Sequence, residues 1–369
     1  MLKGTIAIVD LATASADGNV EQVRLLIANG ADPNSTDSYG NSSLLLASCR
    51  GYFEIVQILL ENGGAQVDNF DVNLVTPLIG ASQAGHPKIV DLLIKYGANV
   101  ELQDKYGNSA LLEAAFGGHL DIVDILLGGS GKATNVNISD KRGQTALMLA
   151  SKKGHFQIVQ QLLENGADLE AKKWDGKTSL ALASSWGRFD IVQLLIESGA
   201  DFNSKDNNDS TPLMEAVKRT HGQVVKFLID KGAHLDCCNI NKQTALLLAA
   251  EVEIDEKYER IIHNLLDAGA NVNCQDKEGW SILMFSSSQG KVEIVDKLIN
   301  QLGADVNSKE KFGQNALMVA AGNGHAGIVQ LLLKADANVN DEDDEGDTAI
   351  TLAKQAQQWP IVELLQAFK

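Results

Sequence analysis

The sequence is poor in several features that mark particular classes of protein. Its 369 residues include four cysteines, Cys49, Cys237, Cys238 and Cys274, whose spacing fits neither a metal site nor a dense disulfide framework. No run approaches the ~18 consecutive apolar residues that a membrane-spanning helix needs. The apolar N-terminal segment is interrupted by Asp10 and has no clear cleavage site, so we interpret it as a first helix and not as a signal peptide. Reduced thiols predict a cytoplasmic protein, with the nucleus as the alternative.

Basic charge and aromatic side chains are also scarce. The formal net charge is −17, which opposes phosphate backbones and anionic lipid and disfavours nucleic acid as a partner. Aromatic residues make up 5 % of the chain, whereas hydrophobic residues make up 44 %. The sequence therefore predicts an ordered core made mainly of Leu, Ile, Val and Ala.

One short pattern returns along the chain at nearly constant intervals. It reads SALLEAA from Ser109, TALMLAS from Thr145 and TPLMEAV from Thr211. Its copies begin at Ser42, Thr76, Ser109, Thr145, Thr178, Thr211, Thr244, Ser281, Asn315 and Thr348, and a degenerate copy precedes Gly18. Most of the steps are 33 or 34 residues, which indicates a repeat protein.

Each copy predicts two helices with a tight turn between them. The opening Ser or Thr is suited to bind the free N–H groups at a helix start. In the second half, Ile158, Val159, Leu162 and Leu163 fall on one face of a helix. A glycine such as Gly166 follows, where a helix commonly ends in a left-handed residue. Neither helix hides its apolar face alone, so neighbouring units must stack.

These residues, taken in order, resemble the ankyrin repeat. The match is fullest in one copy, at Asp140, Gly143, Thr145, Leu147, Ala150, Gly154, His155, Ile158, Val159, Leu162, Leu163, Gly166 and Ala167. The resemblance implies an all-α repeat solenoid of about eleven helix–turn–helix units with protruding β-hairpin or loop fingers, in a single domain over residues 1–369. The approximate repeats are 5–37, 38–70, 71–104, 105–140, 141–173, 174–206, 207–239, 240–276, 277–310, 311–343 and 344–369.

The sequence departs from the ankyrin pattern in several places. The histidine that usually follows the T-P-L step is absent, and that slot holds Ile79, Leu112, Met148, Ala181 or Met214. We expect apolar packing there in place of the hydrogen bonds of that histidine.

Other departures alter length or turn chemistry. Residues 128–132 lengthen the loop after the fourth repeat, and residues 251–260 insert an acidic segment between the helices of the eighth. Leu74 replaces the finger glycine in the third repeat. The acidic insertion is a candidate contact of its own, although loops also tolerate added length at low cost.

No catalytic, cofactor-binding or metal-binding residue is predicted. The segment GGSGKAT from Gly128 differs from a phosphate-binding loop, since Leu126 stands where the first glycine belongs and Ala133 where Ser or Thr should bind Mg²⁺. Histidines such as His155 and His221 recur at the turn, at least one repeat apart, and are interpreted as structural. The sequence therefore predicts a non-enzyme without a cofactor or small-molecule substrate.

The remaining informative positions are the finger tips and the ends of the first helices. In ankyrin-like arrays these form the concave surface that partners contact. Here they carry aromatic and basic residues, and Trp, Tyr and Arg are the types most enriched in interface hot spots. The predicted partner-binding residues are Tyr39, Tyr106, Phe116, Lys141, Arg142, Lys152, Lys153, Trp174, Lys177, Trp186, Lys218, Arg219, Trp280 and Phe312. We expect an adaptor, scaffold or inhibitor that binds a partner protein segment, and the basic residues favour an acidic one. The alternatives are nucleic-acid binding through the central basic stripe and a structural subunit of a larger assembly.

Overall fold

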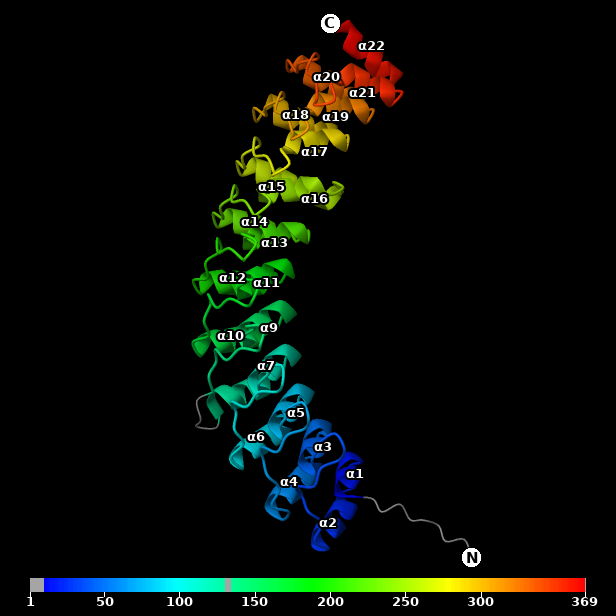
Figure 1. Ribbon diagram of the computed structural model, residues 1–369. Helices are drawn as coiled ribbons and strands as arrows, with labels where there is room; N and C mark the ends of the chain where they lie inside the picture. Colours follow the sequence, from blue (N-terminus) through cyan, green and yellow to red (C-terminus); the bar gives the residue numbers. More distant parts are fainter. Residues whose placement is uncertain (1–9, 130–133, 369) are drawn as a thin grey trace, which may run out of the picture. The chain divides into compact units, whose positions relative to one another are not determined.

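The computed structural model describes residues 10–129 and 134–368, and these residues form paired helices with finger loops between the pairs (Figure 1). The first helices of the pairs are α1 (Leu11–Ala16), α3 (Ser43–Arg50), α5 (Pro77–Ala84), α7 (Ala110–Gly117), α9 (Ala146–Lys153), α11 (Ser179–Ser185), α13 (Pro212–Lys218), α15 (Ala245–Glu251), α17 (Ile282–Ser288), α19 (Ala316–Gly322) and α21 (Ala349–Gln355). The second helices are α2 (Val20–Ala28), α4 (Phe53–Glu61), α6 (Pro87–Lys95), α8 (Leu120–Asp124), α10 (Phe156–Glu164), α12 (Phe189–Glu197), α14 (Gly222–Asp230), α16 (Glu256–Asp267), α18 (Val292–Asn300), α20 (Ala326–Lys334) and α22 (Trp359–Ala367). A π-helical turn, η1 (Ile125–Gly129), follows α8.

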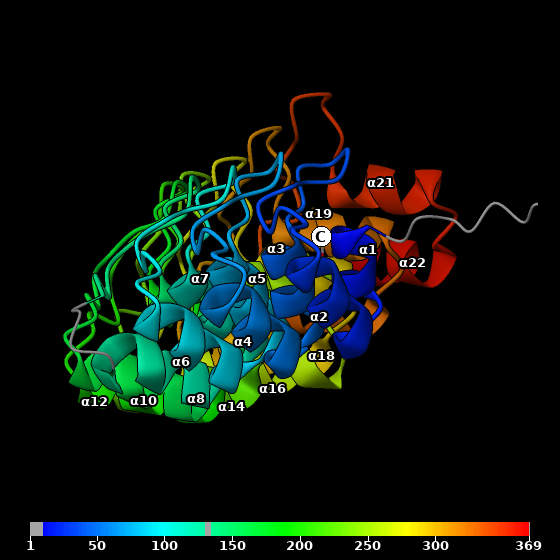
Figure 2. The same cartoon turned by 90° about the horizontal axis from the view of Figure 1, so that it is seen from below.

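The chain divides into two compact units. One comprises Met1–Ala183 with Asp190–Ala200, and the other comprises Ser184–Phe189 with Asp201–Lys369. In the first unit α3 packs on α5, α5 on α7 and α7 on α9; in the second, α13 packs on α15, α15 on α17 and α17 on α19. Within each unit the fingers project to one side of the helices (Figure 2). The expected all-α repeat fold is confirmed.

The recurring Ser or Thr caps the first helix of most pairs, as its side chain predicts. Thr145 Oγ1 accepts a hydrogen bond from Met148 N (3.4 Å), and Thr244 Oγ1 accepts one from Leu247 N (3.3 Å). Asn315 does the same at α19 with its amide oxygen. Each cap binds one of the N–H groups that a helix start leaves free.

The slot without the usual histidine is filled by apolar side chains, as expected. Ile79, Met148 and Met214 are at most 2 % exposed. The turn histidines supply hydrogen bonds between repeats instead. His155 Nε2 donates to the carbonyl of Phe116 (3.2 Å), one repeat earlier. These histidines are therefore structural.

The fingers are hairpin-like loops. Among the described residues no β-strand forms, and four isolated antiparallel bridges, such as Ser139 with Thr145, close finger bases. Gly107 turns its finger tip with a φ of 88°, and Leu74 adopts a φ of 62° at the equivalent position. Leu74 therefore takes the left-handed backbone conformation that costs a residue with a Cβ about 1–2 kcal/mol.

The insertion in the eighth repeat is bound to its neighbours. It lengthens α16 to 12 residues, whereas most other second helices have nine. Ile254 is buried, and its N–H donates to Gln289 Oε1 (2.7 Å) in the next repeat. Tyr258 Oη donates to the carbonyl of Lys218 (3.4 Å) in the preceding repeat. The insertion is thus an ordered part of the stack.

Two segments singled out in the sequence fall largely outside the described residues. The N-terminal segment is described from Asp10, which caps α1, and residues 1–9 lie outside. Of the lengthened loop after the fourth repeat, residues 130–133 lie outside.

Candidate functional site

Backbone hydrogen bonds hold neighbouring finger tips together. Lys141 N donates to the carbonyl of Tyr106 (3.0 Å), and Trp174 N donates to the carbonyl of Arg142 (2.9 Å). Within the fourth finger, Asp104 Oδ1 accepts from Tyr106 N at 2.8 Å. The tip side chains therefore start from a fixed backbone, which reduces the entropy that binding would cost.

A hollow of about 390 Å³ lies between the fourth and fifth repeats in the first unit. Tyr106, Lys141 and Arg142 line it from the finger tips, and Phe116 lines it from the end of α7. Its apolar floor includes Leu112, which is buried. The structure thus brings together four of the residues that the sequence predicts as a binding site.

A second hollow of about 440 Å³ adjoins the first, and Tyr106, Asn108, Gln83 and Glu113 line both. Burial raises the pKa of the Glu113 carboxyl, and the nearby Asp104 raises it further. We call the two hollows together the finger-side groove. Its rim is basic, and three carboxylates, Asp104, Glu113 and Asp140, also line it.

Most of the exposed aromatics in this region lie beside a cation. Lys153 Nζ lies 4.1 Å from the centroid of the Phe116 ring. Lys173 Nζ lies 5.8 Å from the Trp174 ring, and that tryptophan is 73 % exposed. Such pairs contribute about 0.5–1 kcal/mol at exposed sites, so they orient the rings without covering them completely.

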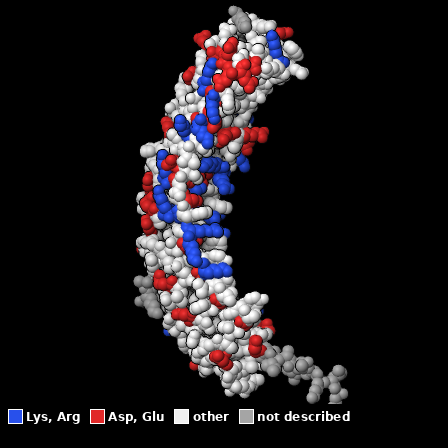
Figure 3. Space-filling model, viewed as in Figure 1, with Lys and Arg blue, Asp and Glu red and all other residues white. Residues whose placement is uncertain are grey.

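The other predicted residues of the first unit lie near the groove or along the fingers. Lys152 is half-buried at the end of α9, and Lys177 is half-buried in the sixth finger. Tyr39 stands at the tip of the second finger and is 69 % exposed. Figure 3 shows Lys and Arg gathered at the level of α9, whereas few charged side chains appear at the level of α3 and α5.

The second unit contains the other predicted residues. Arg219 lies 6.0 Å from the Trp186 ring, and Lys218 Nζ contacts Ser210 Oγ at 3.1 Å. Lys218 also lines a hollow of about 500 Å³ together with Ile240. Ile240 is 60 % exposed in the finger slot that holds Lys141 and Trp174 elsewhere, but it is neither aromatic nor basic, so its residue type does not indicate a binding position.

Two of the predicted aromatics of the second unit differ in exposure. Trp280 is half-buried and packs against Phe285, with 5.0 Å between the ring centroids. Phe312 is 61 % exposed at its finger tip, with Lys311 Nζ 5.7 Å from its ring. Trp280 therefore offers less free surface than Phe312.

Within residues 10–129 and 134–368, no group of three His, Cys, Asp or Glu side chains is arranged to hold a metal ion. No helix in this part of the chain is long and apolar enough to pass through a lipid bilayer.

Comparison with known proteins agrees with the architecture. A family model described as ankyrin repeats (3 copies) matches the chain over residues 11–104, 69–138, 111–206, 201–276, 252–343 and 283–368. No curated protein matches it. Since the family matches extend over most of the chain and the helix pairs stack as its repeats require, the chain belongs to the ankyrin-repeat family.

Proposed function

We propose that this chain is an adaptor, scaffold or inhibitor that binds an acidic segment of a partner protein in its finger-side groove. Ankyrin repeats are generally protein–protein interaction modules and are typically not enzymes. The observation that carries the proposal is the convergence of Tyr106, Phe116, Lys141 and Arg142 on one hollow. Aromatic rings supply apolar contact area, and the cations complement carboxylates.

The chemistry of the groove favours an acidic partner over a basic one. Lys141, Arg142 and Lys153 surround the two aromatic rings, while Glu113 lies in the floor with its pKa raised. A carboxylate of the partner would meet cations first at the rim. An apolar side chain would then reach the rings of Tyr106 and Phe116.

Charge reversal at the rim tests the proposal. Partners are captured from a cell lysate with the wild-type chain, and the affinity of the best-enriched acidic partner is measured by titration. We expect Lys141→Glu, and likewise Lys152→Glu combined with Lys153→Glu, to weaken binding about tenfold or more. The salt dependence of binding should fall at the same time, because ion pairs have been lost.

Lys88→Glu provides the matched control. Lys88 is exposed on α6, a second helix, and it does not line the groove. The substitution changes the net charge as much as Lys141→Glu does. Equal affinities for the Lys141→Glu chain and the wild type would refute the groove assignment.

Two other functions remain as alternatives with their own tests. The basic finger tips would favour nucleic acid if they outweighed the net charge of −17, and a gel-shift assay decides this. If the chain is a structural subunit, size-exclusion chromatography of a lysate should show it in one large assembly, in a fixed ratio to the other subunits.

A further inference from the structure

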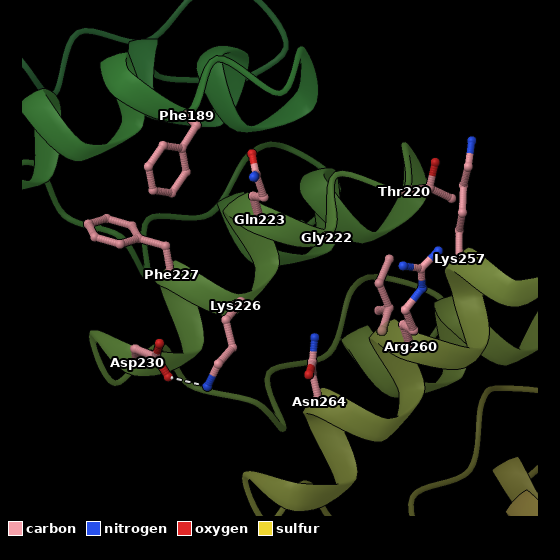
Figure 4. A pocket seen from close by; sticks show the side chains of 11 residues that line it. Phe189, Thr220, Gly222, Gln223, Lys226, Phe227, Asp230, Lys257, Arg260 and Asn264 are labelled. Atoms are coloured by element: carbon pink, nitrogen blue, oxygen red, sulfur yellow. Dashed lines mark hydrogen bonds and ion pairs between the residues drawn. The ribbon is translucent and has the colours of Figure 1, made fainter.

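A pocket of about 640 Å³ lies in the second unit, and it shares no lining residue with the finger-side groove. It runs between α14 and α16, and Phe189 closes one end (Figure 4). This volume falls in the range of pockets that hold small molecules or peptide side chains. None of the residues predicted from the sequence for partner binding lines it.

The pocket exists because of two departures from the repeat pattern. Gly222 is the first residue of α14, at the position that holds Phe156 in α10 and Phe189 in α12. A Cβ added to Gly222 would meet no atom within 4 Å. The space that a phenylalanine occupies in those repeats is therefore open here.

The second departure is the insertion that lengthens α16. Lys257, Arg260, Ile261 and Asn264 all line the pocket, and their spacing places them on one face of that helix. Lys257 belongs to the first turn of α16, within the inserted residues. The insertion, although acidic as a whole, thus contributes the cations Lys257 and Arg260 to the pocket lining.

The two ends of the pocket differ in chemistry. Figure 4 shows Phe189 and Phe227 at one end and Lys257 and Arg260 at the other. The two rings meet edge to face, with 5.5 Å between their centroids. One carboxylate, Asp230, lines the pocket, and Lys226 Nζ already binds it at 2.8 Å.

We propose that this pocket is a second binding site and that it receives an acidic peptide segment of a partner protein. An aromatic or large aliphatic side chain of that segment packs against Phe227, and a neighbouring carboxylate binds Lys257 and Arg260. Lys257 and Arg260 are exposed cations in a chain of net charge −17, so they select an anionic ligand locally. The apolar end favours a peptide over duplex nucleic acid, which presents its charged backbone and keeps its bases stacked inside.

Gly222→Phe fills the pocket with a side chain that the fold already accepts at this position. The φ of Gly222 lies outside the left-handed region, so a side chain causes no backbone strain. Gly222→Ala is the matched control, because it adds only a methyl group. Thermal unfolding followed by circular dichroism verifies that both variants are folded.

The probe is an array of short synthetic peptides of varied sequence, applied to the full chain and to the Gly222→Phe chain. We expect the peptides lost on Gly222→Phe to contain an aromatic or large aliphatic residue next to Asp or Glu. For such a peptide, fluorescence anisotropy should show a dissociation constant raised about tenfold or more by Gly222→Phe and by Arg260→Glu. Gly222→Ala and Lys141→Glu should change it by less than about twofold.

Three results would overturn the second site. In the first, the Gly222→Phe chain binds the same peptides as the wild-type chain. In the second, the peptides that no longer bind to the Gly222→Phe chain are basic or lack acidic residues. The third is a duplex oligonucleotide that binds and is displaced by Gly222→Phe. Binding that is lost with Lys141→Glu and kept with Gly222→Phe would assign the peptides to the finger-side groove, leaving the proposed function intact.

Discussion

At the finger tips, the backbone strain depends on whether the residue with positive φ is a glycine. Lys242 occupies this position in the eighth finger with a φ of 58°, and its side chain is exposed. Because glycine adopts this conformation without steric cost, we expect Lys242→Gly to raise the free energy of unfolding by about 1 kcal/mol. Urea unfolding measures the change.

Gly107 provides the reverse experiment at the same position of the fourth finger. Its φ is 88°, and an added Cβ would lie 2.7 Å from the backbone nitrogen of Lys141. Gly107→Ala should therefore lower the free energy of unfolding by more than Lys242→Gly raises it. If both substitutions leave stability unchanged, positive φ is not a source of strain in these fingers.

Cys49 is a second residue whose surroundings predict a measurable property. Burial, more than the nearby Asp71, raises the pKa of its thiol to about 11. The thiol therefore stays protonated at pH 8, and we expect iodoacetamide to label it at least about tenfold more slowly than the exposed Cys238. Peptide mapping by mass spectrometry gives both rates, and equal rates would contradict the assignment.

The raised pKa of Cys49 also fixes the sign of a pH effect on stability. The unfolded thiol ionises near its ordinary value of 9.0, whereas the folded thiol keeps its proton up to about 11. The native state thus binds more protons in this window, and the contribution of Cys49 to stability falls as the pH rises through it. Cys49→Ser should reduce this loss in unfolding experiments above pH 9.

At the scale of helices and loops, Gln289 holds the insertion of the eighth repeat. Its Nε2 donates to the carbonyls of Ala250 and Val252, both at 2.9 Å, and its Oε1 accepts from Ile254 N. Each net hydrogen bond contributes roughly 1 kcal/mol, so the loss of these three bonds in Gln289→Ala should lower the free energy of unfolding by about 3 kcal/mol.

Hydrogen exchange localises the effect of Gln289→Ala. We expect faster exchange over residues 250–256 and unchanged exchange in α3 to α7, which lie in the other unit. Gln289→Glu keeps an acceptor for Ile254 N but places a carboxylate oxygen against the carbonyls of Ala250 and Val252, so it should speed exchange at least as much as Gln289→Ala does. Unchanged exchange at Ile254 in both variants would mean that the loop is held by other contacts.

The sequence predicts the helices well and the contacts between them poorly. Helix starts such as Thr145, and turns such as Gly154, follow from short-range patterns within a repeat. The packing of Trp280 on Phe285 does not, because it depends on the aromatic side chain that α17 places beside this finger. The sequence also does not predict the pocket beside Gly222. That pocket forms because this repeat has a glycine where two earlier repeats have a phenylalanine, and open space is visible only in the structure.

The candidate site likewise has residues that short-range sequence patterns predict and residues that depend on contacts between repeats. Tyr106, Phe116, Lys141 and Arg142 were predicted because finger tips and helix ends are free of core packing. Glu113 was not, because its role in the floor depends on Asp104 and on the depth of the hollow. The residue types at finger tips and helix ends thus predict the rim of the groove. The residues of its floor can be identified only from the three-dimensional structure.

The charge of the whole chain decides between its two candidate classes of partner. The net charge is −17, although basic residues gather on the fingers of the middle repeats and the last finger is acidic, with Asp341 to Glu345 in sequence. A polyanion such as duplex DNA extends well past one groove and meets the acidic surface as well. A short acidic peptide meets the basic rim alone, since charges beyond about 8 Å are largely screened at physiological salt.

We therefore expect the chain to leave a duplex oligonucleotide unshifted in a gel at ~0.15 M salt, while it still binds its acidic protein partner under the same conditions. Lowering the salt should not produce a tight complex, because the net charge repels the duplex more strongly as screening weakens. A shift that strengthens steeply at low salt and disappears with Lys141→Glu would reverse the conclusion. It would mean that the local basic rim outweighs the charge of the entire molecule.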